Sequence, residues 1–191
     1  MSRELPSKQE LRQRLRHARQ LVDSSTRVCQ ENLLCQILAN LPQWQTARHI
    51  FAYIATPEEP SLAGLWQNFP DRTWVFPRCN WSSKTLNWHI LNPQHLAQQI
   101  ETDRYGIPSP QPDLPQVEID RADVILVPAL ACDRLGYRLG YGGGFYDRSL
   151  LSYQGFTVGI VLHQFLMDEL PHDAWDIRLK AVVSDREVMI F

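Results

Sequence analysis

The feature that most constrains the fold is a strand–loop–helix pattern between residues 123 and 150. Asp123–Leu130 is an apolar, β-branched run, which is typical of a buried strand. Five of the nine glycines of the chain follow between Gly136 and Gly144, and a helix is expected to begin near Gly143. Glycines let a backbone adopt positive φ and approach a ligand closely. The segment therefore predicts a ligand loop at the carboxyl end of a strand, where open α/β sheets bind their ligands.

Charged side chains around the glycines indicate what this loop binds. Arg138 and Arg148 bracket it, and backbone N–H groups at the start of a helix attract anions such as phosphate. Asp133 and Asp147 lie beside it in the sequence, and a carboxylate next to phosphate is expected mainly where Mg²⁺ lies between them. The alternative is a glycine-rich surface turn, which explains two or three glycines but not the charges. The loop matches neither G-x-x-x-x-G-K-[ST] nor G-x-G-x-x-G.

Composition narrows the class of protein. A chain of 191 residues with 44% apolar and 21% charged residues predicts one ordinary globular domain, residues 1–191. The net charge of −2 argues against a nucleic-acid partner. Its four cysteines have no metal-ligand spacing and suit a reducing compartment. There is no apolar signal region and no run of about 18 apolar residues. We therefore expect a cytoplasmic protein without a membrane span.

A basic helix is predicted near the N-terminus. Ser7 and Glu10 have the spacing of a capping box at its start. Two stripes then lie side by side on the helix, an apolar one (Leu11, Leu15, Ala18, Val22) and a cationic one (Lys8, Arg12, Arg16, Arg19). The cationic stripe is either a solvated surface or an edge that closes over a polyphosphate, and the pattern alone does not decide between them.

The remaining elements alternate between helix and strand. Helices are expected over residues 24–41 (capped by Ser24 or Ser25), 61–69 and 145–151, and strands over 48–55, 73–77, 86–91, 155–162 and within 181–190. The short turn between 73–77 and 86–91 predicts an antiparallel pair. The proline-rich segment 105–115 is expected to be a surface connection within one domain. The alternation predicts an α/β fold with a mostly parallel sheet flanked by helices.

The string G-Y-R-L-G-Y-G-G-G-F-Y-D-R (136–148) resembles the signature of the 5-formyltetrahydrofolate cyclo-ligase family, the 5,10-methenyltetrahydrofolate synthetases. K-x-x-L-R (8–12), the glutamate loop (56–60) and a late aspartate (Asp176) resemble further motifs of the family in the same order. The resemblance implies a fold like that of the sugar-phosphate isomerase and CoA-transferase group. It also implies ATP- and Mg²⁺-dependent conversion of 5-formyltetrahydrofolate to 5,10-methenyltetrahydrofolate, ADP and phosphate, through a phosphorylated formyl intermediate.

The resemblance also assigns roles to residues. It implies ATP contacts at Lys8, Arg12, Arg138, Gly140, Gly142, Gly143, Gly144 and Tyr146. Folate contacts would come from Ile54, Glu59, Tyr141, Gly142, Gly143, Gly144 and Phe145. Arg138 and Tyr146 would act in catalysis, and Asp147 and Asp176 would bind Mg²⁺. Arg16 and Arg19 are expected to remain surface residues.

Several positions depart from the family pattern or stay open. Relatives often carry Asp-Thr shortly after the pterin-binding glutamate, where this chain has Ser61 and Leu62, and some carry basic residues inside the glycine loop, where Tyr141 and Gly143 are neutral. Phosphate charge would then depend on Arg138, Lys8, Arg12 and Mg²⁺. Asp176 alternatively caps a loop, and Trp74, Trp81 and Trp88 either stack on a pterin or fill the core. Arg78 and His163 receive no role.

Two other functions stay open, both without nucleic acid or membrane. One is a paralogue with the same ATP site and another substrate. The other is a nucleotide-binding module without activity, although two separated aspartates argue against simple binding. The expected partners are 5-formyltetrahydrofolate and ATP, and the expected state is a monomer or weak homo-oligomer.

Overall fold

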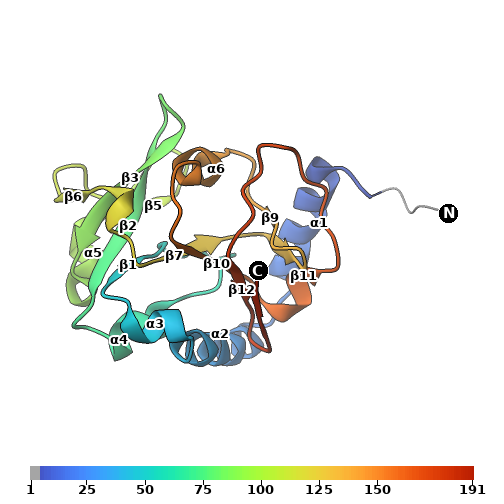
Figure 1. Cartoon of the computed structure of the whole chain (residues 1–191), viewed down its shortest axis with the longest axis horizontal. Coiled ribbons are helices and arrows are strands. Elements are labelled where there is room, and N and C mark those ends of the chain that lie inside the picture. Colours follow the sequence, from blue (N-terminus) through green and yellow to red (C-terminus); the bar gives the residue numbers. More distant parts are fainter. Residues whose placement is uncertain (1–4) are drawn as a thin grey trace.

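The computed structural model describes residues 5–191 and contains a central sheet with helices on both sides (Figure 1). Its eight strands have the order β13-β12-β10-β7-β1-β2-β3-β6. Their bounds are β1 (His49–Phe51), β2 (Thr73–Asn80), β3 (Thr85–Leu91), β6 (Gln116–Val117), β7 (Val124–Pro128), β10 (Phe156–Ile160), β12 (Ala181–Val183) and β13 (Val188–Ile190). The five neighbouring strands from β12 to β2 run parallel, and the outer pairings are antiparallel. The predicted α/β fold with a mostly parallel sheet is confirmed.

Six α-helices and several short elements complete the described chain. The helices are α1 (Lys8–Gln20), α2 (Ser24–Ala39), α3 (Pro42–Thr46), α4 (Ala63–Asn68), α5 (Leu96–Gln99) and α6 (Phe145–Leu150). Three turns of 3₁₀ helix are η1 (Pro93–His95), η2 (Ile119–Arg121) and η3 (His163–Phe165). Two small sheets are formed by β11 (Leu166–Met167), β8 (Ala131–Asp133) and β9 (Arg138–Leu139), and by β4 (Ile100–Thr102) and β5 (Pro108–Pro110). No helix among the described residues combines the length and apolar character needed to cross a membrane.

The central sheet is buried on both faces, as its apolar strands require. Side chains alternate along β7: Val124 and Leu126 join the core under α2 and α3, while Ile125 and Val127 join the core that includes Leu150 of α6. Figure 1 shows α2, α3 and α4 together along one side of the sheet and α6 on the other. Each of these fully buried aliphatic side chains contributes about 1.5–3 kcal/mol to folding. The buried strands therefore form a rigid base for the loops at their carboxyl ends.

The starts of α1 and α2 show which residues act as N-caps. The predicted capping box is confirmed: the Glu10 N–H donates to Ser7 Oγ, and the Ser7 N–H donates to Glu10 Oε2 at 2.9 Å. The predicted cap of the second helix is wrong. Asp23 caps it by accepting the Thr26 N–H at 3.0 Å, and Ser24 is the first helical residue.

Other elements differ from prediction in length. The second helix ends at Ala39 rather than 41, and Pro42 begins α3, where its missing N–H is harmless. The first strand was expected over 48–55 but ends at Phe51, because the backbone leaves the sheet toward the glutamate loop after the Ala52 N–H bonds to Val75. The antiparallel pair of β2 and β3 is confirmed. The proline-rich segment stays off the central sheet as predicted, although β5 within it pairs with β4.

Candidate active site

A large cavity opens at the carboxyl ends of β1 and β7. Its volume is about 1360 Å³, and its wall includes residues from α1, the glutamate loop, the glycine loop and the segment around residue 175. Every residue that was predicted to contact ATP, folate or Mg²⁺ lines this cavity: Lys8, Arg12, Ile54, Glu59, Arg138, Gly140, Tyr141, Gly142, Gly143, Gly144, Phe145, Tyr146, Asp147 and Asp176. Segments separated by more than a hundred residues in sequence thus share one concave surface.

The glycine loop has the backbone geometry that its composition predicts. Gly142 and Gly144 adopt φ of 103° and 67°, in the left-handed region that side chains disfavour. The helix expected near Gly143 begins at Phe145, with Gly144 as its N-cap, and it is only six residues long. Its dipole is correspondingly a minor part of the site. An anion in this cavity would depend instead on side-chain cations and on the loop amides.

Two arginines fix the loop from either side. Arg12 Nε of α1 donates to the Gly140 carbonyl at 2.9 Å. Arg148 Nε donates to the Lys84 carbonyl at 2.8 Å, and its Nη2 donates to the Gly143 carbonyl. The loop carbonyls are therefore engaged, which leaves its N–H groups for a ligand.

Arg138 and Asp147 form the central ion pair of the cavity. Arg138 Nη2 donates to Asp147 Oδ1 at 2.9 Å, and only 4% of the Arg138 side chain is exposed. The same Asp147 oxygen accepts the Ile177 N–H at 3.3 Å. A guanidinium this well buried is weakly screened by water, so its field acts strongly on charge brought into the cavity.

A second group of charges joins α1 to the segment 170–178. Lys8 Nζ contacts Asp173 Oδ2 at 2.6 Å and also pairs with Asp176 Oδ2. Burial alone lowers the pKa of Lys8, but the hydrogen bonds and charges of the two aspartates outweigh it and the pKa is raised. Lys8 is therefore a full cation at neutral pH. The Asp176 oxygen also accepts the Asp173 N–H at 2.7 Å, so its loop-capping role and its place in the cavity coexist.

Asp147 and Asp176 suit a divalent ion by their chemistry. Each uses one oxygen on protein donors, whereas Asp147 Oδ2 and Asp176 Oδ1 accept no hydrogen bond within residues 5–191. No three His, Cys, Asp or Glu side chains of this range gather into a closed metal cage. Mg²⁺ usually takes one or two carboxylates and completes its shell with water and substrate phosphates. The donor set therefore fits a Mg²⁺ ion shared with a phosphorylated ligand.

Glu59 lies at another wall of the cavity. It is 7% exposed, and its Oε2 accepts the Thr56 N–H at 2.9 Å. Burial is the main reason that the pKa of Glu59 is raised, and hydrogen bonds and the Arg19 charge act in the opposite direction. A buried acceptor of this kind gains from a ligand that offers paired N–H donors. This arrangement suits the donor edge of an aminopyrimidinone.

Aromatic rings form the rest of the wall. Trp81 packs edge-to-face on Phe145 at 4.9 Å and lies 4.1 Å from the Tyr105 ring. The Tyr146 hydroxyl is buried without a hydrogen-bond partner among the described residues. Burial raises the pKa of Tyr146 far above its ordinary value, so it remains a phenol and a donor. An unpaired buried donor at a cavity wall is a feature that a bound acceptor would satisfy.

Comparisons with known proteins agree with this geometry. The sequence profile of the 5-formyltetrahydrofolate cyclo-ligase family matches residues 4–185. The chain belongs to this family. A cyclo-ligase of Escherichia coli K12 is 39% identical over 98 residues, which cover 49% of this chain and 54% of that protein. A relative from Mycolicibacterium smegmatis is likewise matched over 54% of its length, so the chain spans about half the length of these curated relatives.

Other relatives are matched over more of their length. The cyclo-ligase of Haemophilus influenzae is 26% identical over 186 residues, which cover 90% of this chain and 94% of that protein. The solved 5,10-methenyltetrahydrofolate synthetase of Aquifex aeolicus is similar with a TM-score of 0.82 at 27% identity, covering 96% of this chain and 92% of that one. A Mycoplasma pneumoniae synthetase, at 20% identity and a TM-score of 0.74, shares the fold.

Two expectations about the candidate site need correction. Arg19 is not a surface residue: it is 1% exposed, and its guanidinium donates to backbone carbonyls inside the protein. Asp133 does not line the cavity, because it is fully buried and accepts the N–H groups of Leu135, Tyr137 and Leu170. It therefore organises the turn before β9 rather than binding a metal.

The tryptophan alternatives are resolved in part. Trp74 and Trp88 belong to the two buried cores, while Trp81 lines the cavity. Arg78 pairs with Glu101 at 2.8 Å and donates to the Pro110 carbonyl, so it attaches β2 to the small β4–β5 ribbon.

The sequence reasoning missed several cavity residues. Asp173 pairs with Lys8, and Trp175 lines the same wall with an exposed indole. Tyr105 and the adjacent residues 106–109 of the proline-rich segment also line the cavity, although no function was expected of them. The repeated aspartate in His172-Asp-Ala-Trp-Asp176 was a usable signal for Asp173, because two carboxylates three residues apart can meet one cation. The proline-rich segment carried no such signal.

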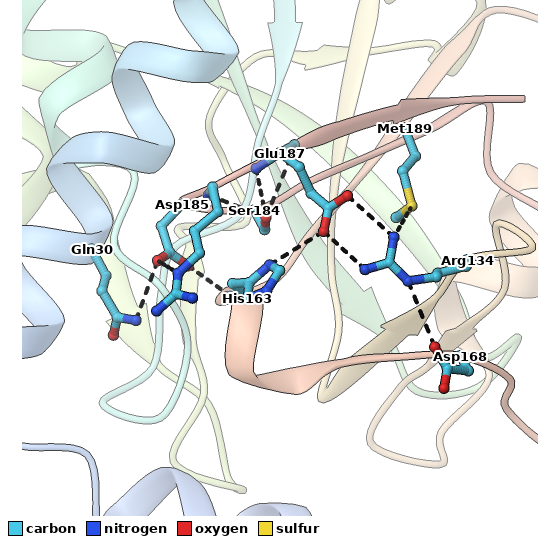
Figure 2. Close-up of polar contacts among 9 residues, drawn as sticks. Gln30, Arg134, His163, Asp168, Ser184, Asp185, Glu187 and Met189 are labelled. Atoms are coloured by element: carbon cyan, nitrogen blue, oxygen red, sulfur yellow. Dashed lines mark hydrogen bonds and ion pairs between the residues drawn. The ribbon is translucent and has the colours of Figure 1, made fainter.

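His163 belongs to a separate polar cluster that lies outside the cavity (Figure 2). The backbone N–H of His163 donates to Asp185 Oδ1 at 2.6 Å, and Gln30 Nε2 donates to Asp185 Oδ2 at 3.3 Å. Nearby, Arg134 makes two parallel hydrogen bonds to Glu187, at 3.1 and 3.0 Å. These contacts join α2, η3 and the turn between β12 and β13, which is a structural task.

Proposed function

We propose that the protein converts 5-formyltetrahydrofolate and MgATP to 5,10-methenyltetrahydrofolate, ADP and phosphate. Family membership supports the reaction class, and the charges of the cavity support the two substrates. One observation carries the proposal: a buried cation, Arg138, and a half-paired carboxylate, Asp147, flank the glycine loop in the same cavity that holds Glu59. A phosphate-binding wall and a pterin-binding wall thus face one space.

The charge distribution suggests how the two substrates are oriented. Lys8, Arg12 and Arg138 would hold phosphate oxygens of ATP, with the N–H groups of residues 140–144 around them. Glu59 would accept the donor edge of the pterin, and Ile54, Tyr141 and Phe145 would form the folate wall. If a phosphate displaced Lys8 from Asp173 and Asp176, the Lys8 ammonium would still be paired with a negative charge.

The proposed chemistry has two steps. The formyl oxygen attacks the γ-phosphorus of ATP and ADP leaves, which turns a poor leaving group into a phosphate ester. N10 then attacks the activated carbon, phosphate leaves, and the N10 proton is lost as the ring closes. Phosphoryl transfer needs mainly positioning and neutralisation of charge, and the buried Arg138 guanidinium is suited to both. The free Tyr146 hydroxyl would donate to the formyl oxygen or to the transferring group.

Asp147 and Asp176 would hold Mg²⁺ through their unpaired oxygens. When bound, the ion would neutralise phosphate charge, which this chain needs because its glycine loop has no basic residue. Arg138 would then keep the other oxygen of Asp147 oriented, and the Asp173 N–H would do the same for Asp176. We further propose that residues 1–191 act as one domain in the cytoplasm, as a monomer or weak homo-oligomer.

A turnover assay tests the proposal directly. The purified protein is mixed with 5-formyltetrahydrofolate, and the absorbance of the methenyl product is followed with ATP and Mg²⁺ together and with each omitted. The proposal expects product only when both are present, with one ADP released per product. If no product forms while MgATP still binds in calorimetry, the substrate assignment fails and a paralogous activity replaces it. If neither occurs, the cavity is not a nucleotide site.

A further inference from the structure

Helix α1 contacts the segment 170–178, the glycine loop and the glutamate loop through one face. Lys8, Arg12, Arg16 and Arg19 follow at intervals of four, four and three residues, which aligns them on a helix. Lys8 reaches Asp173 and Asp176, Arg12 the Gly140 carbonyl, and Arg16 the Tyr141 carbonyl at 3.4 Å. Arg19, at the far end, reaches the carboxyl end of β7 and the glutamate loop.

Arg19 is an unusual buried cation. It is 1% exposed, and no carboxylate of the described chain lies within ion-pair distance of it. Its guanidinium donates instead to three carbonyls: Ala129 at 2.5 Å, Leu130 at 3.0 Å and Glu58 at 2.6 Å. It also lies over the Phe165 ring at 4.9 Å. Burying a charge is costly unless its donors are satisfied, so these carbonyls are held firmly.

The contact to Glu58 bears on the neighbouring residue, Glu59. The Glu59 carboxylate accepts the Thr56 N–H, and the side chains of Thr56 and Tyr141 lie close enough to lower its pKa as hydrogen-bond donors. Its direction therefore depends in part on the backbone of the loop. Two side chains hold that backbone from outside, Arg19 on the Glu58 carbonyl and Arg27 on the Pro57 carbonyl. Gln20 also donates to the Glu58 side chain, at Oε1, at 3.0 Å.

Arg19 also links this loop to the sheet. One guanidinium bridges Glu58 to Ala129 and Leu130, which directly follow β7. The Arg19 carbonyl in turn accepts from Arg27 Nη2 at 2.6 Å, so the two arginines support each other. The guanidinium charge additionally opposes the effect of burial on the pKa of Glu59. Loss of the Arg19 guanidinium would free the glutamate loop while leaving the glycine loop in place.

We propose that Arg19 is a positioning residue that fixes the glutamate loop, and hence Glu59, for folate binding. The inference rests on the proposed function. Arg19, a buried residue outside the cavity wall, would thus affect folate binding and not ATP binding. Arg19 touches neither substrate and acts through Glu58 and Glu59.

The first test compares Arg19→Lys and Arg19→Gln with Arg14→Gln, an exposed arginine of the same helix that serves as the matched control. Thermal unfolding first establishes that each variant is folded. The Arg19 variants should raise the KM and the calorimetric Kd for 5-formyltetrahydrofolate by about tenfold or more, as expected for lost charged hydrogen bonds. The KM for ATP should change by less than about twofold, and the lysine should rescue part of the loss. Equal loss for both substrates, or no loss in a folded variant, would overturn the proposal.

A double-variant cycle separates positioning from general damage. In a Glu59→Gln background, Arg19→Gln should weaken folate binding by a much smaller factor than in the wild type, because both changes act through one contact. Independent, multiplying losses would contradict action through Glu59. If the Arg19 variants do not fold, Arg27→Gln, which releases the Pro57 carbonyl, should produce the same folate-selective loss, and its absence would overturn the proposal.

The binding measurement also distinguishes the two proposals. If the wild type binds 5-formyltetrahydrofolate but makes no product, the proposed reaction fails while the Arg19 effect on Kd is still read. If the wild type does not bind the folate at all, both proposals fall.

Discussion

The cavity and the cluster of Figure 2 are built from the same kinds of side chain but differ in how completely their carboxylates are satisfied. In the cluster, Glu187 uses both oxygens on Arg134, and Asp185 uses both on His163 and Gln30. In the cavity, Asp147 and Asp176 each keep one oxygen free of protein donors from the described chain.

That difference separates a structural ion cluster from a binding site. A carboxylate whose oxygens all have protein donors gains little from a ligand, whereas one with a free oxygen beside a buried cation can take a metal or a donor. Counting charged residues does not distinguish the two regions. Counting their unused acceptors does.

The largest effect is expected at the central cation of the cavity. Arg138→Ala should lower turnover by about 10³-fold or more, because it removes the buried charge that we propose to stabilise the transferring phosphate. The fold should remain intact by circular dichroism. The matched change in the other region, Arg134→Ala, should leave kcat/KM within about twofold of the wild type. Near-normal turnover of Arg138→Ala would remove Arg138 from the site.

The next effect concerns the free carboxylate oxygens. Asp147→Asn keeps the size of the side chain and loses its charge, so turnover should fall by about 10²-fold and half-saturation should require more Mg²⁺. Asp185→Asn is the control in the satisfied cluster, and its Mg²⁺ dependence should equal that of the wild type. A Mg²⁺ titration of the rate for both variants is the measurement, and equal titration curves would refute the metal assignment.

The reverse pattern is expected for stability. Asp185→Ala removes the acceptor of the His163 N–H and of Gln30, and should lower the free energy of unfolding by about 1–3 kcal/mol. Its kcat/KM should stay unchanged at a temperature where the variant is folded. Urea unfolding followed by Trp fluorescence gives the first quantity. A loss of activity without a loss of stability would show that the second cluster takes part in function.

The smallest effect is a stability gain at Glu59. Burial raises the pKa of Glu59 in the folded state, so the folded protein holds this proton more tightly than the unfolded chain. Its stabilising contribution is therefore present below the unfolded pKa of about 4.3 and is lost as pH rises through the folded value. Glu59→Gln should match the wild type in Tm at low pH and exceed it at pH 7, while losing folate affinity.

A pH series of thermal unfolding curves checks this expectation. A variant that is less stable than the wild type at pH 7 would mean that Arg19 and Thr56 outweigh the cost of burial. The control is Glu58→Gln, which changes the neighbouring and more exposed side chain of the same loop.

The sequence predicted the parts of the molecule that depend on local pattern. The run at Asp123 specifies a buried strand, the glycines specify a loop with positive φ, and Ser7 with Glu10 specifies a helix start. The candidate site residues that the cyclo-ligase motifs indicated all line one cavity.

The sequence could not reveal which polar groups are satisfied. Arg19 belongs to the same cationic stripe as Arg12, yet Arg19 is buried against the carbonyls that follow β7 and Arg12 reaches the glycine loop, because periodicity does not encode the tertiary contacts of α1. Asp133 stands as close to the glycines in sequence as Asp147 does, but its oxygens accept the N–H groups of nearby Leu135 and Tyr137 and of distant Leu170. The short length of β1 and the place of residues 105–109 in the cavity wall likewise depend on tertiary contacts.

The central claim is that the half-satisfied aspartates make this cavity a MgATP site. The most direct measurement is a calorimetric titration of ATP into the wild type and into an Asp147→Asn, Asp176→Asn double variant, each with Mg²⁺ and with chelator. The account predicts that Mg²⁺ strengthens ATP binding by the wild type and has little effect on the double variant. ATP binding that responds to Mg²⁺ equally in both proteins, or in neither, would contradict it.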